Sequence, residues 1–254
     1  MQVEALAQSA FETERLLTLT TGKLPLVLVA PHGGREAIPE IGVRTGNGVP
    51  QFKTGRDHNT AELAAAIAAK LGEISGAKPF LVIARFDRKY IDANRPFTEA
   101  YEAREAQPYY AAFHSAVDKA CEQIRNVWGR GLLLDLHGQG AEANVIFRGT
   151  RHGKSVADLV QRFGSQALSG SRSILGQLAL RGYKILPDPS VNDASGAIAA
   201  AIPCKPMAVT ATAASMPFSW SLERGFGRAI TSIAPTPMSP LQSECSPENT
   251  CQSV

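Results

Sequence analysis

Three continuous apolar runs predict the buried strands of a sheet. They span residues 24–30 (LPLVLVA), 80–84 (FLVIA) and 131–135 (GLLLD), and strands that are covered on both faces have unbroken apolar runs of this kind. Weaker patterns over residues 144–148 and 183–186 predict two further strands. In open α/β sheets, ligands collect beyond the carboxyl ends of the strands, so the residues that follow these runs are the first place to look for a site.

Helical periodicity fills the stretches between the runs. Asn59 and Glu62 have the spacing of a capping box, and the helix that they open is predicted to end at Gly72. Its predicted buried face consists of Leu63, Ala66, Ile67 and Leu71. Strands that alternate with helices predict a layered α/β fold with a mainly parallel or mixed sheet.

A longer helix is predicted to open at Pro108. Apolar residues then recur at three- and four-residue spacing: Tyr110, Phe113, Val117, Cys121, Ile124 and Trp128. We therefore expect Cys121 to pack in the core rather than to react. Later in the chain, Ser155 is a predicted cap of a helix that runs to Phe163, and the apolar residues around Ile174 mark another helix.

Composition narrows the class of protein. Of the 254 residues, 44% are hydrophobic and 19% are charged, and the net charge is +3. The chain is therefore expected to fold, and it has no electrostatic footprint for nucleic acid. It contains no run of 18 apolar residues, and its first residues are mixed and acidic, so neither a membrane span nor a signal peptide is predicted. We expect a cytoplasmic enzyme or binding protein.

Two of the five histidines follow predicted strands directly. His32 comes after the run LVLVAP, and His137 comes after LLLDL; each precedes glycine. Two histidines and a carboxylate form a catalytic zinc site with an open fourth position. His58 and His114 are expected to be structural or surface residues.

The third ligand has two candidates. Glu36 lies four residues after His32, and Asp57 lies just before a predicted helix. Asp135, two residues before His137, is better placed to orient an imidazole, because side chains two apart on a strand share a face.

A cationic segment follows the second apolar run. Residues 85–96 (RFDRKYIDANRP) carry four cations and two aspartates. Arginine binds a carboxylate through two hydrogen bonds and asparagine adds a donor. We therefore predict that Arg88, Asn94 and Arg95 bind a carboxylate of the substrate.

Together these motifs resemble the N-formylglutamate amidohydrolase family. The sequence pattern of that family is a Pro-His-small-Gly turn, then an aspartate before a helix, an Asp-x-Asn-Arg-Pro run and an Asp-x-His strand end. They occur here as residues 31–34 (PHGG), Asp57, residues 92–96 (DANRP) and residues 135–137 (DLH). The resemblance covers roughly residues 24–190, and the family is similar to zinc carboxypeptidases.

The resemblance implies a three-layer α/β/α fold of the phosphorylase/hydrolase type, with a mixed central sheet. It also implies one zinc ion held by His32 and His137, with Asp57 as the third ligand by match to the family or Glu36 by analogy with carboxypeptidases. Asn94 and Arg95 would hold the α-carboxylate of a small N-acyl amino acid. The implied reaction is hydrolysis of its amide bond, for example in N-formylglutamate.

Two alternatives remain at this point. The chain could be a carboxypeptidase-like metallopeptidase, or a degenerate member that binds a ligand without turnover. The expected partner is a small molecule rather than nucleic acid or a membrane, and a homo-oligomer is compatible with the sequence.

The composition changes abruptly near residue 196. Three of the four cysteines and three of the four methionines lie beyond it. We divide the chain into a metallohydrolase core, residues 1–196, and an anomalous tail, residues 197–254. The family carries its proton-transferring glutamate on a late strand that the tail lacks. Read in a shifted reading frame, residues 214–225 extended in both directions allow the string GIDAIQLELGTRF, which has a glutamate at the expected place. We infer a frameshifted tail, from a gene lesion or a sequencing error.

Overall fold

The computed structural model describes residues 15–39, 41–140, 142, 144–150 and 153–188. The boundary predicted at residue 196 and the tail 197–254 lie outside these residues.

The main sheet has four strands in the order β1-β3-β2-β4. They are β1 (Leu17–Thr20), β2 (Leu26–Ala30), β3 (Phe80–Ala84) and β4 (Leu132–Asp135). The central strand β2 pairs in parallel with β3 and β4, whereas β1 pairs antiparallel with β3. The predicted mixed sheet is thus confirmed. The sequence analysis missed β1, because this edge strand alternates apolar and polar residues (LTLT) and lacks the continuous apolar run of the other three strands.

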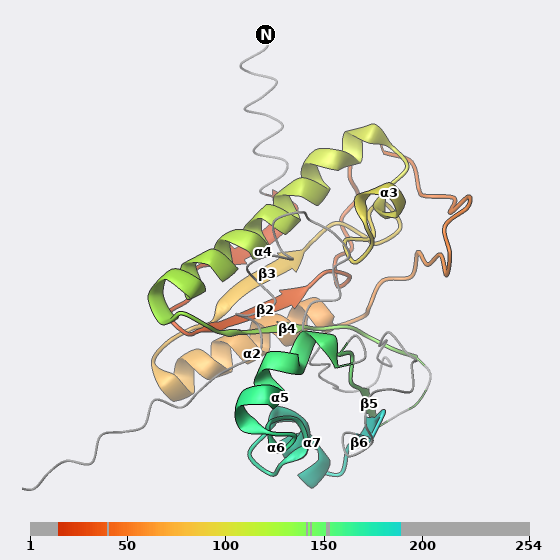
Figure 1. Cartoon of the computed structure of the whole chain (residues 1–254). Helices are drawn as coiled ribbons and strands as arrows, with labels where there is room; N and C mark the ends of the chain where they lie inside the picture. The colour runs from red at the N-terminus through yellow and green to blue at the C-terminus, as the bar shows by residue number, and fades with distance from the viewer. Residues whose placement is uncertain (1–14, 40, 141, 143, 151–152, 189–254) are drawn as a thin grey trace, which may run out of the picture.

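Helices cover both faces of this sheet and complete the three predicted layers (Figure 1). On one face lies α4 (Gln107–Trp128), with the predicted apolar residues Phe113, Val117, Cys121 and Ile124 in the larger core cluster. On the other face lies α2 (Thr60–Ser75), which packs against alternate residues of the same strands, such as Leu28 and Ile83. Cys121 is buried, as predicted, and burial raises the pKa of its thiol.

The buried face of α2 differs from the prediction. Ala61, Ala64 and Ala68 contact the sheet, whereas Ala66 is exposed. Small side chains let the helix approach the backbone closely. A Cβ on Gly33 would lie 2.5 Å from the main-chain nitrogen of Ala61, so only glycine fits there.

Both ends of α2 also differ from the prediction. Asn59 has a left-handed conformation, with φ of 63°, and its side chain makes no capping hydrogen bond. The helix continues through Gly72 and ends at Gly76, whose φ is 71°. Gly76 has the conformation that glycine favours after a helix, which Gly72 lacks.

A smaller unit follows β4. Strands β5 (Val145–Phe147) and β6 (Lys184–Leu186) lie where the weaker patterns predicted strands, and they form a separate parallel pair. Between them lie η2 (Lys154–Val156), α5 (Ala157–Phe163), α6 (Gln166–Ser169) and α7 (Ile174–Leu180). Ser155 lies within η2, so it does not cap α5. The short α3 (Phe97–Ala100) and η1 (Arg104–Ala106) precede α4. No helix among the described residues is both long and apolar enough to cross a bilayer.

The contact between α4 and the sheet gives a stability prediction. Phe113 is fully buried and meets Phe86 edge-on, with 6.4 Å between ring centroids. Phe113→Ala should lower the free energy of unfolding by about 3–5 kcal/mol, as other buried phenylalanines do. Val127→Ala, at an exposed position of the same helix, should change it by less than about 0.5 kcal/mol. Urea denaturation measures both, and equal effects would contradict this packing.

Candidate metal centre

The ends of two neighbouring parallel strands place the two predicted histidines. Val29 of β2 lies opposite Asp135 of β4, and a few residues further on each chain segment reaches its histidine, His32 or His137. The third residue, Asp57, comes from the loop that leads into α2, and its main-chain N–H donates to the carbonyl of His32 at 2.8 Å. Segments that are 25 to 105 residues apart in the sequence therefore meet at one edge of the sheet.

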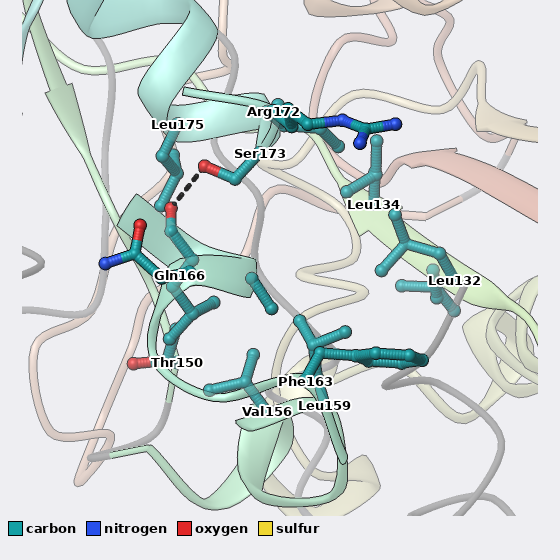
Figure 2. Close-up of a pocket in the computed structure, with 14 residues that line it drawn as sticks. Leu132, Leu134, Thr150, Val156, Leu159, Phe163, Gln166, Arg172, Ser173 and Leu175 are labelled. Atoms are coloured by element: carbon teal, nitrogen blue, oxygen red, sulfur yellow. Dashed lines mark hydrogen bonds between the residues drawn. The ribbon is translucent and has the colours of Figure 1, made fainter. Parts of the chain in front are cut away.

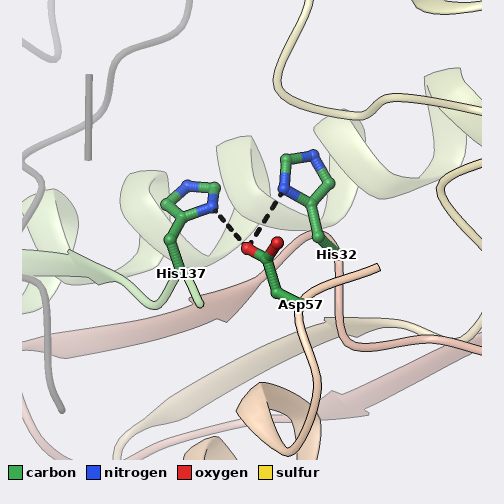
Figure 3. Close-up of side chains that lie close together, drawn as sticks. All are labelled: His32, Asp57 and His137. Atoms are coloured by element: carbon green, nitrogen blue, oxygen red, sulfur yellow. Dashed lines mark hydrogen bonds and ion pairs between the residues drawn. The ribbon is translucent and has the colours of Figure 1, made fainter. Parts of the chain in front are cut away.

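The two imidazoles lie on either side of one carboxylate oxygen of Asp57 (Figure 3). Asp57 Oδ2 lies 3.1 Å from His137 Nδ1 and 3.5 Å from His32 Nδ1. It also accepts a hydrogen bond of 2.9 Å from the main chain of Gly138. All three side chains are buried, and the two imidazole centroids are 5.0 Å apart.

Each imidazole has a second aspartate on its far nitrogen. His32 Nε2 lies 2.7 Å from Asp92 Oδ1, and His137 Nε2 lies 3.0 Å from Asp135 Oδ2. A carboxylate at Nε2 holds the proton on that nitrogen and turns Nδ1 toward the centre of the group. The orienting role that the sequence indicated for Asp135 matches this contact.

Burial and charge together determine how these groups ionise. Burial opposes ionisation of Asp57, but the hydrogen bond from His137 and the nearby charge of His32 hold its pKa well below the usual range. Burial likewise opposes ionisation of Asp92, but His32 and Arg88 keep its pKa low. For His137, burial favours the neutral ring, yet Asp135 and Asp57 outweigh it and raise the pKa to about 10. An entering cation must therefore displace a proton from His137.

The group has the composition and spacing of a metal site. The ligand atoms of His32, Asp57 and His137 all lie within 4.8 Å of one another. His32 Nδ1 is buried and makes no hydrogen bond within the described part of the chain, although buried polar atoms are normally satisfied. Two imidazoles and a carboxylate are also a ligand set that binds zinc with one position open. These residues can hold a metal ion.

Arg88 faces the acidic side chains of this group. Its Nε and Nη2 donate to Asp92 Oδ2 at 2.9 and 2.8 Å, and its Nη1 lies 3.6 Å from Asp57 Oδ1. The sequence analysis predicted that Arg88 binds substrate. In the structure it pairs with two of the buried carboxylates, whose charge it balances, and its binding of substrate stays a prediction.

The other two predicted substrate-binding residues lie at the edge of the group. Asn94 Nδ2 is 3.2 Å from His137 Nε2. The guanidinium of Arg95 is partly exposed; its Nη2 donates to the carbonyl of Gln51 and its Nη1 lies 3.4 Å from Glu99 Oε2. A ligand carboxylate that reached Arg95 would compete with these two partners.

Glu36, the alternative third ligand, lies outside the group. Its backbone forms a bridge to the segment after β3, with hydrogen bonds to Arg85 and Asp87, and its side chain is exposed. Of the two carboxylates considered from the sequence, the structure brings Asp57 to the histidines.

Sequence reasoning missed two contributors near the group. Asp92 received no role, although it stands two residues before Asn94 in the same motif, as Asp135 stands two before His137. His114 was expected to be a structural or surface residue; it is buried on α4, where its ring lies 4.1 Å from the ring of Tyr110. No local pattern distinguishes such a histidine from its apolar neighbours on the helix.

A separate cavity of about 620 Å³ lies against β4 (Figure 2). Its lining is mainly apolar and includes Leu132 and Leu134 of the strand, with Leu159, Phe163 and Leu175 from the helices of the smaller unit. None of the metal-group residues lines it.

Fold and site together define a three-layer α/β protein with a buried His-Asp-His group at the carboxyl edge of its sheet. No family model and no curated protein matches the chain. Among solved structures, it is similar to the 2.00 Å crystal structure of N-formylglutamate amidohydrolase from Ralstonia eutropha JMP134. The two are 20% identical, the match covers 69% of this chain and 78% of that chain, and the TM-score is 0.45.

The buried His114 gives a pH prediction. Burial lowers its pKa to about 4, from an ordinary value of 6.5. Below pH 6.5 the unfolded chain binds a proton at His114, whereas the folded chain binds it only below about pH 4. The contribution of His114 to the free energy of unfolding is therefore fully present above pH 6.5. About 3 kcal/mol of it is lost as the pH falls to 4. His114→Phe should remove this component. Urea denaturation between pH 7 and 4 measures it, and parallel pH curves for the two proteins would contradict the assignment.

Proposed function

We propose that this protein is a zinc-dependent amidohydrolase that acts on an N-acyl amino acid with a free carboxylate, such as N-formylglutamate. The observation that carries the proposal is the pair of buried imidazoles. Both Nδ1 atoms face Asp57, while each Nε2 lies against its own aspartate. The choice of substrate rests on the motifs that resemble the N-formylglutamate amidohydrolase family.

His32, Asp57 and His137 would hold the zinc ion. When bound there, zinc supplies a Lewis acid that polarises the amide carbonyl and lowers the pKa of a water molecule. Asp92 and Asp135 keep both imidazoles in the required tautomer, because each accepts the proton on Nε2. Arg88 balances the charge of Asp57 and Asp92, so these buried carboxylates stay ionised without a second cation.

Substrate binding is assigned to Asn94 and Arg95. Asn94 lies beside His137, and Arg95 Nε lies 4.0 Å from Asp92 Oδ2; both residues are half-buried. A carboxylate held by Arg95 would place the rest of a small substrate toward the histidines. Recognition of a carboxylate by arginine adds orientation as well as affinity.

The proton-transferring glutamate is the part that the described residues do not supply. Among the described ranges between residues 15 and 188, no glutamate forms a hydrogen bond or ion pair with His32, Asp57 or His137. Loss of such a group costs roughly 10²–10⁴ in rate. This observation favours a second candidate function, a zinc-binding protein that holds N-acyl amino acids with little or no turnover.

Metal content and formate release test the proposal together. The full chain should bind one zinc ion, and His32→Ala, His137→Ala and Asp57→Ala should each remove it, because each deletes a ligand. Glu36→Ala is the matched control and should retain the ion. Zinc is measured by elemental analysis after dialysis, and unchanged zinc in the His32 or His137 variant would refute the site.

The same preparations are then assayed for formate release from N-formyl-L-glutamate. A variant whose gene has its reading frame restored near residues 195–202 should release formate about 10²–10⁴-fold faster than the chain with the present tail, because it regains the glutamate. Bound zinc without hydrolysis of any N-acyl amino acid in either chain would support the binding protein over the enzyme.

Arg95→Ala should chiefly raise the KM for N-formyl-L-glutamate. Loss of a charge-assisted hydrogen bond costs about 1.5–3 kcal/mol, which corresponds to roughly 10–100-fold. Arg35→Ala removes an exposed arginine that pairs with Glu62 outside the site, and it should leave the KM unchanged. Steady-state kinetics or a calorimetric Kd gives the comparison. An unaltered KM in the Arg95 variant would remove its assigned role.

A further inference from the structure

The loop between β3 and α3 carries three of the side chains that surround the metal group. Asp92 contacts His32, Asn94 contacts His137, and Arg95 Nε lies 4.0 Å from Asp92 Oδ2. Inside the loop, Arg95 N donates to the carbonyl of Asp92 at 3.0 Å and Asn94 N donates to Asp92 Oδ1 at 3.1 Å. These bonds shape the loop, but they do not attach it to the layers of the fold.

Ile91 and Ala93 pack into the main core cluster, and helix α4 adds two side-chain contacts to the loop, one turn apart. The hydroxyl of Tyr110 donates to the carbonyl of Arg95 at 2.9 Å. The ring of His114 forms a hydrogen bond with the main chain of Ala93. The two rings lie against each other, with centroids 4.1 Å apart, and Phe113 meets His114 at 5.4 Å. Neighbouring rings thus hold both donors in place.

We propose that Tyr110 and His114 are positioning residues: together they clamp the Asp92–Arg95 loop onto α4 and so fix the metal ligands and the substrate arginine relative to each other. This inference rests on the proposed function for its substrate side. His114 holds the residue after Asp92 and therefore acts mainly on the metal group. Tyr110 holds Arg95 itself and therefore acts mainly on the binding of the carboxylate.

The ionisation and burial of both side chains support this role. Burial raises the pKa of Tyr110 to about 12, so its hydroxyl keeps the proton that it donates. Burial keeps His114 neutral, and its Nε2 is buried without a hydrogen bond to the described residues. An apolar ring would avoid the cost of burying that nitrogen. The bond to Ala93 is thus the contribution that sets histidine apart from phenylalanine at this position.

Zinc affinity tests the His114 part without any need for turnover. Competition of the full chain with a chromogenic chelator gives the zinc Kd. His114→Phe keeps the ring and loses the hydrogen bond, and it should weaken zinc binding about tenfold or more, as loss of a ligand-orienting contact does. His114→Asn places an amide N–H near the same point and should restore most of the affinity. Equal weakening of zinc binding in both variants would show that the packing of the ring, and not its hydrogen bond, is what matters, and it would overturn the assignment.

Substrate binding tests the Tyr110 part. Tyr110→Phe should leave the zinc Kd unchanged and raise the KM or calorimetric Kd for N-formyl-L-glutamate about threefold to tenfold, the effect of one neutral hydrogen bond. The matched control is Tyr101→Phe. Tyr101 belongs to the same ring cluster, 5.5 Å from Tyr110, and it should change neither value. Equal effects of the two tyrosine variants would overturn the Tyr110 role.

The two proposals fail in different ways. Zinc binding that His114→Phe leaves unchanged would overturn the clamp alone. Absence of zinc from the unaltered chain would overturn the proposed function and, with it, the metal side of the clamp.

Discussion

Parallel pairing of β2 with β3 on one side and β4 on the other is the constraint on which the site depends. Parallel strands end at the same edge of a sheet, so the loops that follow all three strands leave the sheet side by side. One loop carries His32, the next carries Asp92 and the third carries His137. The helix α2, held close to β2 by the lack of a side chain at Gly33, brings Asp57 between them.

Charge balance is what allows these polar groups to stay buried. Each imidazole lies between two carboxylates: Asp57 faces both rings, and Asp92 and Asp135 each contact one. Arg88 then pairs with the two aspartates nearest to it. Such a network is costly when one member is missing, because the remaining charge is left unpaired in a dry environment. His32 Nδ1 is buried and makes no hydrogen bond to the described residues, so a cation bound there would give this nitrogen a partner.

Much of the fold and part of the site could be predicted from the sequence. The apolar runs located β2, β3 and β4, and the periodicity of residues 108–128 identified the helix and its buried Cys121. Helix α2 shows the limit of such patterns. The prediction favoured the larger Leu63 and Ile67, which are only partly buried, whereas the close approach to the sheet selected small alanines for the fully buried positions. Asp92, His114 and the pairing of Arg88 depend on contacts between segments, which no local pattern encodes.

The sequence by itself determined which residue types follow which strands, because local apolar patterns specify secondary structure and its ends. From this came His32, His137 and the loop with Asn94 and Arg95. Only the tertiary structure shows that Asp57, and not Glu36, lies against the histidines, and that Arg88 pairs with the buried acids. The contacts concerned join Asp57 to His137, 80 positions away, and to His32 and Arg88, 25 and 31 positions away. They arise from strand order and helix packing, which bring distant side chains together after the local elements have formed.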